Sequence, residues 1–352
     1  KISTFKIRLM EFLKKNFSIL SLLISFLFLI YTFYRAEIHW GGNEKLYYSS
    51  YYKISFFLII CSVISFFVKD KLKEYIIIIL FSLIITIYVF EGYLTYKAGY
   101  KMRVYEKETG KKYDTRYLLE IYSDLKKNDP NIVIKVTPDD HIQENNSLLP
   151  FSGISNSKTI LGNENGYYII YQSDRYGFRN PDEEWDKNEI EYLLVGDSMT
   201  HGCCVNSDIA SILRKLSNKS VLNLGYGSNG PLLEFGALRE YYDKRAKKVL
   251  WIYFEGNDLH DLTDELKSNL LKNYLNDSSF SQNLKLRHGE INSLVKEKIE
   301  LAEKIGGRGK NRDNFLFKLN SFIKIYNTRR AITKPGYSFE QPAPPIEFKE
   351  IL

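Results

Sequence analysis

Two short stretches decide the fold: LLVGDS at residues 193–198 and EGND at residues 255–258. Each follows an apolar run and ends abruptly in small and polar residues, as a buried strand does when it leaves a sheet. Open α/β sheets carry their chemistry at the carboxyl ends of such strands. The first stretch leaves Ser198 at that edge and the second leaves Asn257. A hydroxyl nucleophile and an amide donor are groups that acyl transfer requires.

Outward from these stretches, strand-like and helix-like runs alternate from residue 190 onward. We expect strands at 192–195, 221–224 and 249–254, and helices at 208–216, 232–242, 264–274, 289–304 and 314–327. Asn206 or Ser207 is the expected N-cap of the first of these helices. Strands that alternate with helices at this spacing predict a three-layer, parallel-sheet α/β domain over residues 190–352.

Three uncharged apolar runs precede this region, at residues 17–34, 54–68 and 75–90. Residues 46–52 extend the second run beyond Lys53, so each run is long enough for a transmembrane helix. Lys and Arg are denser in the amino-terminal arm and the second loop than in the first loop, which places the amino terminus in the cytoplasm. Residues 1–97 are therefore the expected three-span anchor, and the later residues lie outside the cytoplasm. If one run were instead a buried core helix, this orientation would reverse.

Residues 98–189 form the expected extracytoplasmic linker and β-rich lead-in. The pattern predicts a helix at 117–127 and strands at 132–136 and 167–171. The turn at 175–181 has no function that its sequence alone reveals. A Pro-rich connection is expected at 335–345. The last residues, 348–352, resemble the first turns of a helix, so we expect the chain to be truncated at its carboxyl end.

Composition excludes several classes of function. The net charge of +7 comes with no basic stripe interleaved with aromatic residues, so no nucleic-acid partner is expected. Cys61, Cys203 and Cys204 have no metal-ligand spacing, and the adjacent pair is interpreted as small core thiols rather than a vicinal disulfide or reactive site. We expect no metal, nucleotide or other cofactor.

A glycine-rich loop at 223–231 follows the second expected strand, and its backbone N–H groups can form an anion-binding nest. Together with GDS at 196–198 and Asn257-Asp258, this loop resembles the sequence blocks of the SGNH, or GDSL, hydrolases. With YGFR at 176–179, the chain is most similar to membrane-anchored SGNH-like proteins of bacterial surface-polysaccharide modification. The resemblance covers residues 190–262. It implies a flavodoxin-like domain on the periplasmic side of a bacterial cytoplasmic membrane.

The resemblance also implies roles for individual residues. Ser198 would be the nucleophile, and its N–H would form an oxyanion hole with the Asn257 side chain and a loop N–H from Gly227 or Ser228. The candidate substrate-binding residues flank these positions: Asp197, Asp258, His201 and His260.

The chain departs from the family pattern at three places. Ser228 and Glu255 stand where the family has glycines, and no Asp-x-x-His follows Asn257. His201 and His260 are near enough in sequence to serve as the missing base. The simplest interpretation is that the base lies beyond Leu352.

These features lead to a serine esterase or O-acyltransferase that acts on acylated extracytoplasmic glycans or lipids. The missing Asp-x-x-His motivates the alternative, a non-catalytic, membrane-tethered glycan-binding or assembly protein with the same fold. A transporter is disfavoured because the spans lack internal charges. The acyl group, the acceptor and the oligomeric state stay open.

Overall fold

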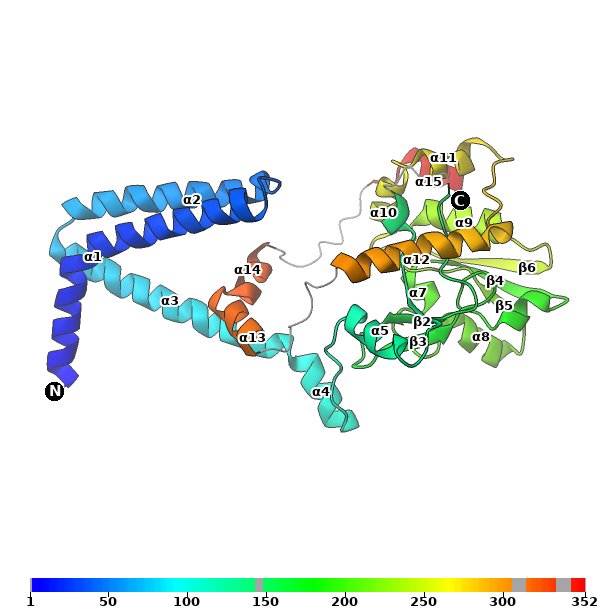
Figure 1. Cartoon of the computed structure of the whole chain (residues 1–352), viewed down its shortest axis with the longest axis horizontal. Helices are drawn as coiled ribbons and strands as arrows, with labels where there is room; N and C mark the ends of the chain where they lie inside the picture. Colours follow the sequence, from blue (N-terminus) through cyan, green and yellow to red (C-terminus); the bar gives the residue numbers. More distant parts are fainter. Residues whose placement is uncertain (1, 143–147, 306–314, 334–342, 352) are drawn as a thin grey trace. The chain divides into compact units, whose positions relative to one another are not determined.

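A computed structural model of the protein describes residues 2–142, 148–305, 315–333 and 343–351 (Figure 1). The chain divides into two compact units. Lys1–Thr95 and Ile325–Arg329 form the first unit, and Tyr96–Lys324 and Arg330–Leu352 form the second. The lead-in and the strand–helix region, which the sequence separated at residue 189, therefore belong to one unit. The short return of Ile325–Arg329 to the first unit was not expected.

The first unit is built from three long apolar helices, α1 (Ile2–Phe33), α2 (Lys45–Ile64) and α3 (Asp70–Ala98). A π-helical turn, Tyr34–His39, extends α1, and a 3-10 turn, Ser65–Phe67, extends α2. The three candidate spans, Met10–His39, Lys45–Phe67 and Asp70–Thr109, are long and apolar enough to cross a membrane. This agrees with the three runs predicted from the sequence.

The helices α1 and α2 lie side by side (Figure 1). Between them, the Oγ atoms of Ser25 and Ser62 form a buried hydrogen bond of 3.0 Å. Small polar residues at such a contact allow close helix approach where lipid provides no hydrophobic driving force. Most large apolar side chains of this unit are exposed, as they are in helices that face lipid.

The second unit begins with α4 (Tyr100–Thr109), α5 (Leu118–Lys126) and a small mixed sheet. In this sheet β2 pairs in parallel with β1 and antiparallel with β3. The strand bounds are β1 (Ile132–Ile134), β2 (Lys158–Gly162) and β3 (Ile169–Gln172), and the short helix α6 (Asp139–Ile142) follows β1. The sequence predicted β1 and β3, within a few residues, and missed β2.

The parallel sheet that carries LLVGDS has the order β5-β4-β6. Its strands are β4 (Ile190–Gly196), β5 (Val221–Asn223) and β6 (Ala246–Ile252). Leu193 of β4 pairs with a residue of each neighbour, Leu222 in β5 and Val249 in β6. Leu193 and the next two residues are fully buried, as expected for a central parallel strand covered on both faces.

Successive residues of β4 pack against different helices. Leu194 and Val221 contact Ala210 of α8 (Ile209–Ser217), whereas Leu193 joins the larger core that contains Leu232 of α9 (Pro231–Tyr241). The alternation of side chains along a strand therefore places α8 and α9 on opposite faces. The unit is mixed α/β, and its assignment to the SGNH fold stays a prediction.

The remaining helices confirm most predicted positions and correct three details. They are α7 (Ser198–His201), α10 (Asp258–Glu265), α11 (Asn269–Asn276), α12 (His288–Ile305), α13 (Phe315–Ile323), α14 (Tyr326–Thr333) and α15 (Ile346–Ile351), with 3-10 turns at Asp182–Asp186 and Leu284–Leu286.

The helices expected at 264–274 and 314–327 are each divided in two. The first breaks before Ser268, whose side chain caps α11. The N-cap of α8 is Asp208, not Asn206 or Ser207, because the Asp208 carboxylate accepts the Ser211 N–H at 2.7 Å. The helix start expected near 348 is α15, and much of the Pro-rich connection lies outside the described residues.

Candidate functional site

Ser198 begins α7 directly after β4, at the carboxyl edge of the parallel sheet. The chain can turn there because Gly196 has no side chain. A Cβ at Gly196 would lie 2.1 Å from Thr200 Oγ1 and 2.8 Å from the carbonyl oxygen of Ile252. The close packing of β4, α7 and β6 therefore requires glycine at this position. The Ser198 side chain itself is half-buried.

Asp197 holds this turn together. Its Oδ1 caps α7 by accepting the Met199 N–H at 2.7 Å, and its Oδ2 accepts the Ser198 hydroxyl at 3.2 Å. Asp197 is buried. The Asp197 carboxylate thus orients the Ser198 hydroxyl, and its predicted contact with substrate stays a prediction.

The glycine-rich loop contains an uncommon backbone conformation at Ser228, whose φ of 65° lies in the left-handed region. Glycine adopts this region readily, and other residues do so at a cost of roughly 1–2 kcal/mol. Ser228 therefore has a backbone conformation that glycine adopts without strain. Among the described residues, no group accepts the Ser228 N–H.

The neighbouring Gly227 N–H is already used, since it donates to His201 Nδ1 at 3.2 Å. Of the two loop N–H groups considered for the oxyanion hole, the one of Gly227 is therefore engaged within the chain. In this geometry Ser228 is the loop residue whose N–H can turn to a ligand. The Gly227 contact instead joins the loop to the segment after Ser198.

His201 is fully enclosed and does not act on Ser198 in this arrangement. Its Nε2 lies 3.1 Å from Tyr171 Oη, and its ring stacks on Tyr226 with a centroid separation of 4.5 Å. Because Gly227 donates to Nδ1, the proton of a neutral imidazole is on Nε2. Burial, with the nearby Lys135 and Arg179 charges, lowers the pKa of His201 well below its usual value. Both ring nitrogens of His201 are therefore engaged within the core and burial favours its neutral form, while its role in substrate binding stays a prediction.

At the end of β6, Asn257 is half-buried and its Nδ2 donates to Asp261 Oδ2. An amide nitrogen has two hydrogens, so one donor is left for a ligand. Asp258 is fully buried and accepts the Phe254 N–H at 2.6 Å, which supports the turn after β6, and its predicted contact with substrate stays a prediction. His260 is exposed, and no hydrogen bond joins it to Ser198.

Several buried acids lie at this sheet edge and interact electrostatically with Asp197. Burial raises the pKa of Asp258 to about 7, and it raises the pKa of Glu234 well above its usual value. Glu265 accepts backbone N–H groups of the glycine-rich loop and α9, and burial raises its pKa to about 8. In each case burial favours the protonated form of the carboxyl.

The turn at 175–181, whose role the sequence did not reveal, positions the segment after Ser198. The Arg179 guanidinium donates to the carbonyl oxygens of Gly202, Val205 and Asn206 at 2.9–3.0 Å. It also lies 3.9 Å from the Asp208 carboxylate. The sequence pattern could not predict these contacts, because Arg179 and residues 202–208 are brought together only when the chain folds.

Asp174 fixes this turn from inside the core. One of its oxygens accepts the N–H groups of Tyr176 and Phe178, and the other accepts Asn180 Nδ2 and Trp185 Nε1. Burial raises the pKa of Asp174 to about 6. The Asn180 amide also bonds the β5 backbone at Asn223, so the turn is tied to the sheet.

The cysteine pair offers the one group of potential metal ligands found in the described residues. Donor atoms of Glu164, Cys203 and Cys204 lie within 4.8 Å of one another. The two Sγ atoms are only 2.9 Å apart, whereas two thiolates on tetrahedral zinc are about 3.8 Å apart. Burial raises the pKa of Cys204 to about 12, which favours the protonated thiol. The pair therefore does not form a ready metal site.

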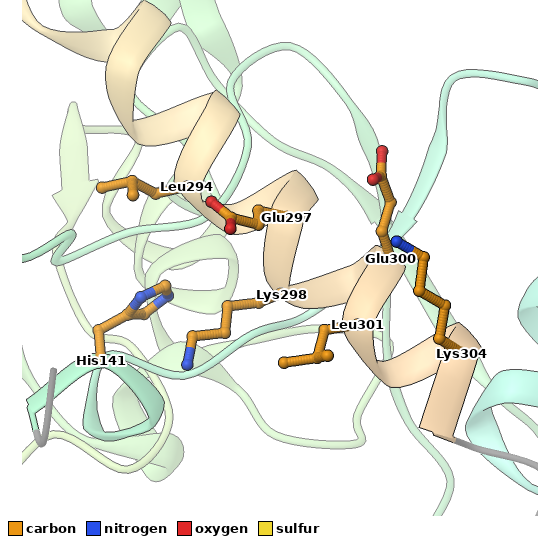
Figure 2. Close-up of a pocket in the computed structure, with 7 residues that line it drawn as sticks. All are labelled: His141, Leu294, Glu297, Lys298, Glu300, Leu301 and Lys304. Atoms are coloured by element: carbon orange, nitrogen blue, oxygen red, sulfur yellow. The ribbon is translucent and has the colours of Figure 1, made fainter.

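A separate pocket of about 340 Å³ lies between α6 and α12 (Figure 2). Figure 2 shows Lys298 extending from α12 toward the α6 turn that carries His141, and its Nζ donates to the Asp140 carbonyl at 3.0 Å. None of the residues predicted to form the site lines this pocket. Comparison with protein-family models, curated proteins and solved structures found no match to this chain.

Proposed function

We propose that the protein is a serine-dependent esterase or O-acyltransferase with Ser198 as its nucleophile. The observation that carries this proposal is the left-handed backbone of Ser228, beside a strand end that presents Ser198. β4 and β5 are adjacent and parallel, so their carboxyl ends share one edge. The segment that carries Asn257 follows β6, the other neighbour of β4. A hydroxyl and two N–H donors at one edge suit attack on an ester carbonyl.

In the proposed reaction, Ser198 Oγ attacks the ester carbonyl carbon and a tetrahedral oxyanion forms. The N–H of Ser228 and the free Asn257 amide hydrogen would donate to that oxygen. Ser198 gives up its hydroxyl proton as the Oγ–carbon bond forms. Collapse of the intermediate breaks the ester C–O bond, the departing alcohol takes up one proton in exchange for the one that Ser198 released, and the acyl group stays on Ser198. Water or a sugar hydroxyl then accepts the acyl group and restores the serine. Asp197 orients the Ser198 hydroxyl at the start.

The proposed substrates are acylated glycans or lipids outside the cytoplasm. Three apolar helices of membrane-spanning length support a bilayer as a constant partner of the chain. The distribution of Lys and Arg in the short loops supports a cytoplasmic amino terminus, and therefore an extracytoplasmic second unit. Such a tethered enzyme would meet substrates that are themselves made or held at the membrane.

The test is covalent labelling of the full-length protein in native membranes with a fluorophosphonate probe. Ser198→Ala is expected to abolish labelling, and Ser207→Ala, an exposed serine in the following loop, is the matched control. Equal labelling of the wild type and Ser198→Ala would contradict the proposal. Activity on an acylated surface glycan that survives Ser198→Ala would do the same.

One observation favours a second candidate, a non-catalytic glycan-binding or assembly protein. His201 has both ring nitrogens engaged away from Ser198, and His260 is exposed. A serine without a base reacts slowly with esters and phosphonates. If folded wild-type protein resists the probe but retains surface glycan on an affinity matrix, this second candidate is the better description.

A further inference from the structure

The helix α13 carries an unusual concentration of exposed apolar side chains. Its sequence is FLFKLNSFI, and five of its residues are exposed large hydrophobics: Phe315, Leu316, Phe317, Leu319 and Ile323. At helical spacing Phe315, Leu319 and Ile323 lie on one side with Leu316 next to them, whereas the half-buried Ser321 lies on the other side together with Phe317. An apolar stripe of this kind needs a partner that is itself apolar.

The chain directly after α13 is fastened to the transmembrane helix α3. The buried Glu91 carboxylate accepts the N–H and hydroxyl of Thr328 at 2.7 and 2.9 Å, and the N–H and side-chain amide of Asn327 at 3.1 Å. Asn327 Nδ2 also lies 3.0 Å from Thr95 Oγ1. These residues form the first turn of α14, so a carboxylate of α3 caps a helix that begins more than two hundred residues later.

This attachment lies at the edge of the membrane-spanning part. The uncharged run of α3 ends at Phe90, immediately before Glu91. Arg329 is close enough to Tyr47 for an electrostatic interaction, and Tyr47 belongs to the tyrosine-rich start of α2. Tyrosines gather at the level of lipid headgroups. Residues 325–329 are therefore held at the boundary between lipid and water.

The covalent chain keeps α13 close to the same boundary. Only Lys324 separates Ile323 from residue 325, and a nine-residue helix is about 14 Å long. The segment is also cationic, because residues 314–339 contain five Lys or Arg and no Asp or Glu. An apolar stripe with basic flanks, tethered at headgroup level, has the properties of an interfacial membrane helix.

We propose that residues 315–333 form a second, peripheral membrane-binding element. In this arrangement α13 lies in the interface of the bilayer with Leu319 and its neighbours in the acyl region, and its basic residues contact anionic headgroups. α14 connects α13 to α3 through Glu91. The partner is the lipid bilayer, and the element is independent of any chemistry at Ser198.

Spin labels at two positions of α13 test the proposal in the full-length chain. Leu319→Cys and Ser321→Cys would each be labelled in a background with Cys61, Cys203 and Cys204 replaced by Ala. The protein is reconstituted in phosphatidylcholine vesicles with and without phosphatidylglycerol. Oxygen partitions into lipid and a nickel chelate stays in water. We expect the oxygen-to-nickel accessibility ratio at 319 to exceed that at 321 by at least about threefold.

Other outcomes of this experiment would overturn the proposal. High nickel accessibility at both positions would place α13 in water, and low accessibility to both reagents at 319 would place it against protein, either its own chain or a second copy. Glu91→Gln and Thr328→Val weaken the attachment without touching α13, so the ratio at 319 is expected to fall in both. An unchanged ratio would show that Glu91 does not hold the segment. Recovery of each variant as one folded species in size exclusion is the control for misfolding.

Discussion

Arg179 Nη1 donates to the carbonyl oxygen of Gly202 at a distance of 2.9 Å, in a side chain that is almost wholly buried. The same guanidinium bonds the carbonyls of Val205 and Asn206, so the loop between α7 and α8 is folded around one cation. One buried cation that donates to three carbonyl oxygens restrains the loop, and the carbonyls of Val205 and Asn206 accept no other hydrogen bond within the part of the chain that the structure describes. The position of α7 therefore depends on Arg179, which lies in the turn before β4.

Arg179→Met should loosen this loop while keeping much of the side-chain volume. We expect a loss of about 3 kcal/mol in the free energy of unfolding, since three loop carbonyls lose a charged donor and one of them is buried. Hydrogen exchange of residues 201–208 should accelerate. Arg175→Met is the matched control, because Arg175 pairs with Asp182 and Asp186 nearer the surface of the same turn. Equal destabilisation by both changes would contradict the special role of Arg179.

Substitutions at Ser228 test whether the left-handed backbone conformation at this position matters more than the serine side chain. Ser228→Gly should keep the fold and the rate of fluorophosphonate labelling, because glycine adopts the left-handed region without strain. Ser228→Val should lower the free energy of unfolding by about 1–2 kcal/mol and slow labelling. Chemical unfolding and labelling kinetics measure the two effects. If the valine variant has the same free energy of unfolding and labelling rate as the glycine variant, the left-handed conformation at residue 228 is not required.

Asn257→Ala addresses the proposed oxyanion contact. Loss of one donor typically removes roughly 2.7–4 kcal/mol of transition-state stabilisation, so the labelling rate should fall by about 100- to 1,000-fold. Asn276→Ala, at the exposed end of α11, should leave the rate unchanged. If Asn257→Ala reacts as fast as the wild type, the amide does not stabilise the oxyanion.

The raised pKa of Glu265 predicts that stability falls as pH rises. The folded state holds the proton up to about pH 8, whereas the unfolded state releases it near pH 4.3. Between these values the folded state binds more protons, so the free energy of unfolding decreases with increasing pH. Denaturant unfolding of detergent-solubilised protein across about pH 4 to 9 measures this slope. Glu265→Gln should flatten the slope, and Glu300→Gln, an exposed acid on α12, should not.

The local elements followed from the sequence more directly than their contacts did. The apolar run that ends in GDS predicts β4 because a central parallel strand is buried on both faces, and Leu193 and Leu194 confirm that. The strand β2 was missed because its few apolar residues lie between turn-forming segments. The cap of α8 was misplaced because Asn206, Ser207 and Asp208 are all good caps, and only geometry distinguishes them.

Sequence patterns could not predict how the residues of the site contact one another. His201 looked like a neighbour of Ser198, but Tyr171 and Tyr226 enclose it, and these residues come from other elements. The same is true of Arg179, which meets its carbonyl partners only after the sheet forms. Ser198, Ser228 and Asn257 were chosen from strand ends, and their participation in catalysis stays a prediction.

The contact between Glu91 and Asn327 has a consequence for the order of events during synthesis. The two residues are 236 positions apart. At about 5–20 residues per second, α3 leaves the ribosome roughly 12–47 s before the turn that caps its carboxylate. For that interval the Glu91 carboxylate lacks the donors that Asn327 and Thr328 supply in the complete chain. Completion of the first unit therefore awaits translation of residues 96–324 of the second unit, and a ribosome that stops before residue 327 leaves the first unit unfinished.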